Sequence, residues 1–186
     1  QHFARLDRQV VLIDLIDHIA SGEDALARLG REMDSVQQAM RIGRRWLPVP
    51  SASGIDRVLF AASKADQVPS EQHTALQSVL QDTLSASLRR TRFKGATCET
   101  MPLAALRATR EMRARDRSDR TYVAGYPAGG DTEVAHFPGS LTDDSAAPPG
   151  TFAPMSFAPP RGLRPSGPWP HHNLDQALAY LLKGRL

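Results

Sequence analysis

Cysteine is nearly absent: Cys98 is the single one in 186 residues. One cysteine cannot form an intrachain disulfide, and it excludes metal sites that need two or more thiolates. The composition fits a reducing compartment, so we expect a cytoplasmic protein. No apolar run approaches the ~18–20 residues that a membrane-spanning helix needs. The first residues, from Gln1, lack a signal-peptide pattern and resemble the middle of a chain, so we expect part of a longer protein.

Strong charge of one sign is also missing. The chain has 23 basic and 20 acidic residues, a net charge of +3, and its arginines are dispersed. Nucleic-acid-binding domains usually carry a concentrated basic face, so we expect no nucleic-acid partner. Arg41, Arg44 and Arg45 could touch phosphate or an acidic partner, but the end of a helix accounts for them more simply. With 41% apolar residues, the length is enough for one domain with a sizeable core.

The most informative stretch is residues 54–66, GIDRVLFAASKAD. Its apolar run ends at Ser63, Lys64 and Asp66, a pattern typical of a buried strand that leads into a polar loop. Ligands of open α/β sheets bind outside the carboxyl ends of the strands. A fixed Asp66 carboxylate can accept two parallel hydrogen bonds from guanine, and the stem of Lys64 can lie along a nucleotide. Ser63 can hold the loop by bonding local backbone groups. A surface Lys–Asp pair in an ordinary loop is the structural alternative, because so short a motif also arises without function.

Two further strand regions flank this stretch. Residues 8–17 contain an apolar run that ends at Asp14, and residues 93–106 lead to Arg107-Ala108-Thr109. Between them, a helix is predicted after Ser21 as N-cap and another after Ser70 as N-cap. The expected apolar faces are Ala25, Leu26, Leu29, Met33, Val36 and Met40 in the first, and Leu76, Val79, Leu80, Thr83, Leu84 and Leu88 in the second. Strand, helix, strand, helix, strand is typical of a parallel α/β sheet with right-handed crossovers.

The pattern changes after residue 106. Residues 110–119 are almost wholly charged and predict a solvated or flexible segment. Residues 121–126 and 133–137 flank a Gly-rich turn, which indicates a β-hairpin. The Pro-rich segment, residues 138–170, carries most of the 14 prolines and predicts an irregular course over the surface. Its expected anchors are Phe152, Met155, Phe157 and Trp169.

A closing helix is predicted over residues 174–183, after Asn173 as N-cap and before Gly184 as a stop. The side chains expected to face the sheet are Leu174, Ala177, Leu178, Leu181 and Leu182.

In this order, the strand ends VLID, SKAD and RAT resemble the second half of a Ras-like G domain, as in ADP-ribosylation factors and Gα. In those proteins the corresponding strands end in a hydrophobic-Asp pattern, N-K-x-D and a T-C-A-T-like loop. More closely, HFARLDRQVVLID, IDRVLFAASKAD, LAALRAT, FPG and HHNLDQALAYLL resemble the bacterial YcjX-like family. That family is described as a P-loop GTPase-like stress protein with a helical insertion.

The resemblance implies an α/β fold: the C-terminal half of a Ras-like P-loop NTPase parallel sheet, with an added β-hairpin and a Pro-rich irregular segment. It divides the chain into residues 1–120, the parallel portion, residues 121–170, the family-specific addition, and residues 171–186, the closing helix of the same domain.

The resemblance also implies binding of GTP or GDP. Lys64 would pack along the guanosine and Asp66 would read the guanine edge. The backbone N–H of Ala108 would meet the guanine O6, with Arg107 and Thr109 shaping that loop. Ser63 stands where N-K-x-D has Asn, so one amide that ties the loops together is lost. Adenine would offer the Asp66 carboxylate one donor and a repelling ring nitrogen, so guanine is expected to be preferred.

No phosphate loop of the form G-x-x-x-x-G-K-[ST] occurs in these residues, and Gly129-Gly130 lacks the Lys and Ser/Thr that would follow. The resemblance places the phosphate loop and the Mg²⁺ ligands before the strand that ends at Asp14. We therefore expect no catalytic or metal-binding residue in this chain, and a structural role for Asp14. GTP hydrolysis is expected only together with the missing N-terminal half.

Two other functions stay open. One is a non-catalytic interaction domain that binds a protein through Phe152, Phe157 and Trp169, and the other is an ATP-using P-loop relative. The resemblance also admits a protein partner or membrane-associated stress machinery. His171-His172 with Asp175 is a weak metal candidate, because adjacent histidines point in different directions. Cys98 with His73 or His136 is a weak nucleophile candidate, because a lone strand cysteine is usually buried and inert.

Overall fold

A computed structural model describes residues 6–40, 42, 54–113, 120–141, 151–164 and 166–184. Their elements, in chain order, are β1 (Arg8–Ile13), α1 (Leu15–Ala20), α2 (Glu23–Ala39), β2 (Arg57–Ala62), η2 (Ala65–Gln67), η3 (Ser70–Gln72), α3 (His73–Thr83), α4 (Ser85–Phe93), β3 (Thr97–Pro102), β4 (Arg110–Arg113), β5 (Thr121–Gly125), β6 (Val134–His136) and α5 (Leu174–Leu182). Two separate sheets result, a parallel one in the order β1-β2-β3 and an antiparallel one in the order β4-β5-β6. The chain therefore has an α/β fold.

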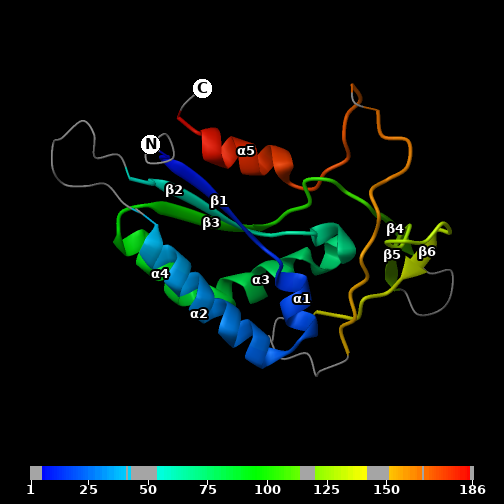
Figure 1. Ribbon diagram of the computed structural model, residues 1–186, viewed down its shortest axis with the longest axis horizontal. Helices are drawn as coiled ribbons and strands as arrows, with labels where there is room; N and C mark the ends of the chain where they lie inside the picture. Colours follow the sequence, from blue (N-terminus) through cyan, green and yellow to red (C-terminus); the bar gives the residue numbers. More distant parts are fainter. Residues whose placement is uncertain are drawn as a thin grey trace.

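The parallel sheet is built around β2, which pairs with β1 on one side and β3 on the other. Residues 58–62 of β2 are all buried, as expected for a strand whose two faces are covered by helices. α2, α3 and α4 lie on one side of the sheet and α5 on the other (Figure 1). The predicted order of three parallel strands with helices between them is confirmed.

Side chains alternate along β2 between two hydrophobic clusters. Val58, Phe60 and Ala62 belong to the larger cluster, together with residues of α1 to α4, while Leu59 and Ala61 belong to the smaller cluster with α5. Each face of β2 thus packs against helices, α1 to α4 on one face and α5 on the other. The carboxyl end of β2 is therefore held in place from both sides of the sheet.

The N-terminal helix boundaries differ from the prediction. Leu15–Ala20 forms α1, which the sequence prediction had joined to the first strand region. Ser21 does not cap α2: it ends α1, where its Oγ donates to Asp17 O at 2.8 Å. Gly22, with φ of +92°, precedes α2 instead. Apolar residues resume at Leu15 directly after Asp14, so hydrophobicity alone could not separate strand from helix.

The predicted second helix is two helices, α3 and α4, interrupted at Leu84. Ser70 does not cap an α-helix but opens the short turn η3, and its N–H and Oγ donate to Glu111 at 2.9 and 3.0 Å. The strand region predicted for residues 93–106 narrows to β3, because Phe93 still belongs to α4 and is 92% exposed.

Most of the predicted apolar faces are buried, with one replacement in α2. Val36 is 41% exposed, and Gln37 occupies the buried position beside it. The Gln37 amide donates to the Thr91 hydroxyl of α4 at 2.7 Å. A buried polar pair therefore takes the place that the apolar pattern assigned to Val36.

Gly30 brings α2 close to the junction of α3 and α4. An ideal Cβ at Gly30 would lie 2.9 Å from the Thr83 carbonyl oxygen, a backbone atom that cannot rotate away. Gly→Ala inside a helix normally stabilises by about 0.5–1 kcal/mol. Here we expect Gly30→Ala to lower the free energy of unfolding by about 1–2 kcal/mol, measured by urea denaturation. Ser35→Ala, on an exposed position of the same helix, is the control, and a stabilising Gly30→Ala would contradict the packing.

The predicted β-hairpin is confirmed, since β5 and β6 pair antiparallel. β4 adds a third strand beside β5. Residues 110–113 were predicted to be solvated or flexible. They are exposed, yet they form a strand because β5 offers them a ladder of backbone partners. Residues 114–119 lie outside the described part.

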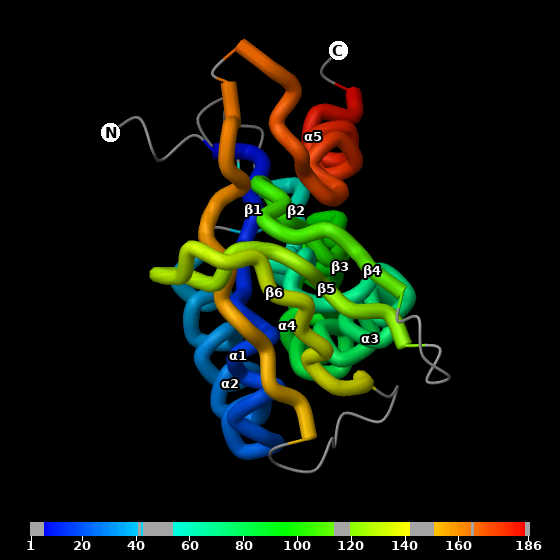
Figure 2. The backbone as a smooth tube through the Cα atoms, turned by 90° about the vertical axis from the view of Figure 1, so that its right-hand side faces the viewer, coloured from blue at the N-terminus to red at the C-terminus, as the bar shows by residue number. Residues whose placement is uncertain are grey.

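The described parts of the Pro-rich segment, residues 138–141, 151–164 and 166–170, have no helix or named strand, as predicted. Figure 2 shows residues 151–164 (orange) running past the β5–β6 hairpin along one side of the molecule. Phe152 is 3% exposed and packs into the larger cluster, so this anchor is confirmed. Trp169 is 52% exposed and does not anchor the segment; its indole N–H only donates to Arg164 O at 3.1 Å. The cluster Arg41, Arg44 and Arg45 lies outside the described residues.

α5 packs on the sheet through Leu174, Ala177, Tyr180 and Leu181. The prediction for Leu178 and Leu182 was wrong, because they are 49% and 42% exposed. Asn173 precedes the helix with φ of +57°, but its amide donates to Pro102 O at 3.0 Å rather than capping α5. None of the described helices is long and apolar enough to cross a bilayer, and the longest, α2, has 17 residues.

Candidate functional site

Parallel pairing brings the carboxyl ends of β1, β2 and β3 to one edge of the sheet. Asp14 follows β1, the SKAD loop (residues 63–66) follows β2, and the β3–β4 loop (residues 103–109) follows β3. The motifs that the sequence singled out are therefore neighbours in space, although 50 residues separate the first two.

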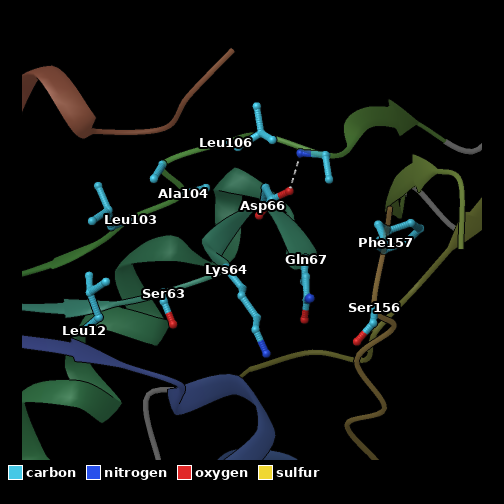
Figure 3. Close-up of a pocket in the computed structure, with 12 residues that line it drawn as sticks. Leu12, Ser63, Lys64, Asp66, Gln67, Leu103, Ala104, Leu106, Ser156 and Phe157 are labelled. Atoms are coloured by element: carbon cyan, nitrogen blue, oxygen red, sulfur yellow. Dashed lines mark hydrogen bonds between the residues drawn. The ribbon is translucent and has the colours of Figure 1, made fainter. Parts of the chain in front are cut away.

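A cavity of about 350 Å³ opens between these loops (Figure 3). It is lined by Leu12, Ser63, Lys64, Asp66, Gln67, Leu103, Ala104, Ala105, Leu106, Ala108, Ser156 and Phe157. The volume falls within the range of about 300–1,000 Å³ that is typical of small-molecule sites. Four of the six predicted site residues, Ser63, Lys64, Asp66 and Ala108, line it.

Asp66 joins the SKAD loop to the β3–β4 loop. Its Oδ2 accepts the backbone N–H of Ala108 at 2.7 Å, and its backbone carbonyl accepts the Thr109 hydroxyl. Asp66 is 8% exposed, and this burial raises the pKa of its carboxyl, while the bond from Ala108 acts in the opposite direction. A buried acceptor and a backbone donor are thus held side by side at the cavity.

Arg107 and Thr109 shape the other side of this junction. The Arg107 Nε donates to Thr109 O at 3.0 Å, within its own loop. Both residues line a second, smaller cavity of about 190 Å³, which also reaches Asp66. They support the loop from behind, and Ala108 alone of the three faces the larger cavity.

Ser63 ties the SKAD loop to the end of β1. Its N–H and its Oγ both donate to Ile13 O, at 2.8 and 3.1 Å. A hydroxyl therefore supplies the loop-to-strand bond at the position where the G-domain pattern has an Asn amide.

Lys64 adopts a left-handed backbone conformation with φ of +58°. Its Nζ lies 2.5 Å from Asp14 Oδ2 and 3.4 Å from Asp17 Oδ2, and the bond to Asp14 is the main cause of a raised pKa of Lys64. In Figure 3, Lys64 and Asp66 leave the loop in opposite directions, Lys64 toward α1 and Asp66 toward the β3–β4 loop. The apolar stem of Lys64 is therefore presented along the cavity while its charge is neutralised at the far end.

The pKa shift of Asp66 predicts how stability depends on pH. Because burial raises the folded-state pKa above the unfolded value of about 3.9, the stabilising contribution is present below that value and is lost as the pH rises through the folded pKa. Asp66→Asn should therefore raise the free energy of unfolding at pH 7. Urea denaturation at several pH values should show the gain shrinking in acid, where Asp66 is protonated in both states. A loss of stability at pH 7 would contradict this assignment.

Several lining residues were not predicted as site residues. Ser156 and Phe157 come from the Pro-rich segment. Phe157 was predicted as a surface anchor and, in the interaction-domain alternative, as a contact for a protein partner. The backbone of residues 170–172 also supports the β3–β4 loop, through hydrogen bonds between Ala104 and His172 and from Arg107 N–H to Pro170 O at 2.7 Å. No local sequence signal marks these contacts, because each joins segments more than 60 residues apart.

The weaker candidates do not assemble into sites. Within the described residues, no group of three His, Cys, Asp or Glu side chains is placed to hold a metal ion. His172 instead packs edge-on against His73, with ring centroids 4.3 Å apart, and burial lowers the pKa of His172. Cys98 is buried, its Sγ donates to Leu88 O at 3.7 Å, and burial raises the pKa of the thiol. It is an inert core residue, as the lone-cysteine pattern indicated.

The SKAD and RAT motifs thus meet in one site, and comparison with known proteins agrees with the family resemblance. The model of the YcjX-like family, DUF463, matches residues 1–186. The chain belongs to the YcjX-like family. The resemblance inferred from the motifs is therefore confirmed over the whole chain.

Two curated relatives are similar to a part of the chain. The Ras-like GTPase YcjX of Shewanella oneidensis is 38% identical over 111 residues, which are 59% of this chain and 23% of that protein. The Ras-like GTPase YcjX of Escherichia coli is 34% identical over 114 residues, which are 58% of this chain and 23% of that protein. The aligned stretch thus spans less than a quarter of the curated relatives it matches.

Proposed function

We propose that the cavity at the ends of β1, β2 and β3 is the base-recognition site of a guanine-nucleotide-binding, Ras-like GTPase. The observation that carries this proposal is the pair formed by Asp66 Oδ2 and the Ala108 N–H, 2.7 Å apart. An acceptor beside a donor is the complement of the guanine edge, which carries ring N–H, amino and carbonyl groups.

Guanine has more to offer this pair than adenine. Entry of a base breaks the internal bond between Asp66 and Ala108, which leaves a buried carboxylate and a partly buried N–H to be satisfied. Guanine supplies two donors to Asp66 and its O6 to Ala108, so it replaces one hydrogen bond with three. Adenine supplies one donor and a ring nitrogen that repels the carboxylate. The cost of opening the pair is therefore offset only by guanine.

The remaining site residues take supporting roles in this proposal. The stem of Lys64 lies along the nucleoside, with its ammonium held by Asp14 and Asp17. Thr109 links the two loops, Ser63 ties the SKAD loop to the end of β1, and Arg107 braces the β3–β4 loop from within. Phosphate binding, Mg²⁺ and hydrolysis are assigned to groups outside these 186 residues, since no phosphate-loop motif occurs in them.

The fold supports the same assignment. We take residues 1–120 as the second half of a Ras-like parallel sheet, residues 121–170 as an addition beside the site, and residues 171–186 as the closing helix. The interaction-domain alternative loses two of its three aromatic contacts, because Phe152 is buried and Phe157 lines the cavity.

Competition binding tests the proposal. Fluorescent GDP should bind the full-length protein and be displaced by GTP and GDP, but not by the same concentrations of ATP and ADP. Equal displacement by adenine nucleotides would favour the ATP-using relative. If no nucleotide binds, the proposed function is wrong.

A further inference from the structure

One wall of the cavity comes from a part of the chain remote from the loops that define the site. Ser156 and Phe157, about 90 residues after Asp66, line the same cavity as Lys64 and Asp66. In Figure 3, Ser156 and Phe157 lie on one side of Lys64 and Gln67, and Leu12 and Ser63 lie on the other. An aromatic side chain therefore lines the cavity on the side opposite the strand ends.

The backbone around Phe157 is fixed to the β5–β6 hairpin. Phe157 forms an antiparallel bridge with Pro127, Ala128 N–H donates to Ser156 O at 3.0 Å, and Ala158 N–H donates to Tyr126 O at 2.8 Å. Hydrogen bonds on both sides of Phe157 thus hold its Cα in place, so its ring can form a preorganised wall.

Gly125, the last residue of β5, provides the seat for this ring. An ideal Cβ at Gly125 would lie 2.9 Å from Phe157 Cδ1 and 3.0 Å from Ala108 O. The Phe157 ring therefore packs on the Gly125 backbone, beside the β3–β4 loop that carries the Ala108 donor. The aromatic wall and the hydrogen-bonding edge of the site are parts of one packed unit.

Phe157 is less buried than Phe152, the residue that anchors the Pro-rich segment. Phe152 is 3% exposed in the larger cluster, whereas Phe157 is only partly buried and faces the cavity. Phe152 and the backbone hydrogen bonds are enough to hold the Pro-rich segment in place. The cavity-facing part of the Phe157 ring is therefore not needed to attach the segment.

We propose that Phe157 is a base-positioning residue, whose ring contacts the purine from the hairpin side and presses its edge toward Asp66 and Ala108. This inference rests on the proposed function. An aromatic ring contacts any base through its π-face and is indifferent to the groups on the base edge. Phe157 thus contributes affinity, while Asp66 contributes the choice of base.

The division of roles gives a sharp test in the full-length protein. Phe157→Leu should weaken binding of both GDP and IDP by the same factor, about 5- to 150-fold, because stacking is lost for either base. Pyrophosphate, which has no base, should compete with wild-type affinity. Phe157→Tyr should restore GDP binding to near the wild-type level.

Phe137→Leu is the matched control. Phe137 follows β6, packs against Tyr122 with ring centroids 5.8 Å apart, and does not line the cavity. This variant should bind GDP, IDP and pyrophosphate like the wild type.

The outcomes separate this inference from the proposed function. If the wild type binds GDP with a selectivity that depends on Asp66, but Phe157→Leu binds like Phe137→Leu, Phe157 does not position the base and the proposed function stands. Loss of pyrophosphate binding together with GDP binding would show a structural role and overturn the inference. Absence of guanine selectivity in the wild type overturns the proposed function itself, and this inference with it.

Discussion

Asp66→Asn should change the preferred base of the full-length protein from guanine to xanthine. The carboxylate accepts from both donors of guanine, whereas an amide supplies one acceptor and one donor. The substitution removes one charge-assisted hydrogen bond, which contributes about 1.5–3 kcal/mol, and makes the other a weaker neutral one, so GDP binding should weaken by about 10²–10³-fold. Xanthine carries a carbonyl in place of the guanine amino group, so this carbonyl can accept from the side-chain amide that the substitution introduces. Competition of fluorescent XDP and GDP against the variant measures the change.

The control for this exchange is Asp82→Asn, an exposed carboxylate of α3 that does not line the cavity. It should leave both affinities at the wild-type level. If the folded Asp66→Asn protein still prefers GDP over XDP, Asp66 does not recognise the base.

The same substitution connects selectivity with stability. Asp66→Asn is expected to stabilise the fold at pH 7, because it removes a buried charge whose pKa is raised by burial. A change that raises stability and removes selectivity identifies a group retained for its chemistry rather than for folding. An ordinary structural carboxylate would show the opposite sign, with stability lost on neutralisation.

The sheet and the core of the site could be predicted from local patterns. The apolar run of residues 58–62 is long enough for a strand and too short for a helix, and polar residues end it sharply. Because parallel strands place their carboxyl ends at one edge, Asp14, Asp66 and Ala108 had to come close once the strand order was known. The hydrogen bonds of Asp14 with Lys64 and of Asp66 with Ala108 follow from that geometry.

Other features depended on contacts between distant segments. The break at Leu84 has neither Gly nor Pro to mark it, and the whole α3–α4 face is equally apolar. β4 carries exposed, charged residues, so its strand conformation comes from pairing with β5 rather than from its own pattern. Phe157 reaches the cavity only because the hairpin and Gly125 hold it there. None of these contacts can be predicted from the pattern of residues that are neighbours in the sequence.

Gly139→Ala should lower both the stability of the fold and its affinity for GDP. Gly139 has φ of +104°, and an ideal Cβ would overlap the Thr151 carbonyl oxygen and lie 3.1 Å from Phe152 Cα. Both are backbone atoms, so no rotamer change relieves the contact. A positive φ costs about 1–2 kcal/mol for alanine, and the forced backbone shift costs about 1–3 kcal/mol more. Thermal unfolding should therefore begin roughly 5–15 °C lower.

Gly129→Ala separates the two costs, because Gly129 has φ of +83° but nothing within 4 Å of an ideal Cβ. It should show only the backbone penalty and bind GDP normally. In Gly139→Ala, the displaced residue next to the contact is Phe152, the core anchor of the segment that carries Phe157 five residues later. GDP affinity should thus fall as it does in Phe157→Leu, with pyrophosphate binding retained. Destabilisation without any change in GDP affinity would mean that residues 151–158 brace the hairpin and take no part in holding the base.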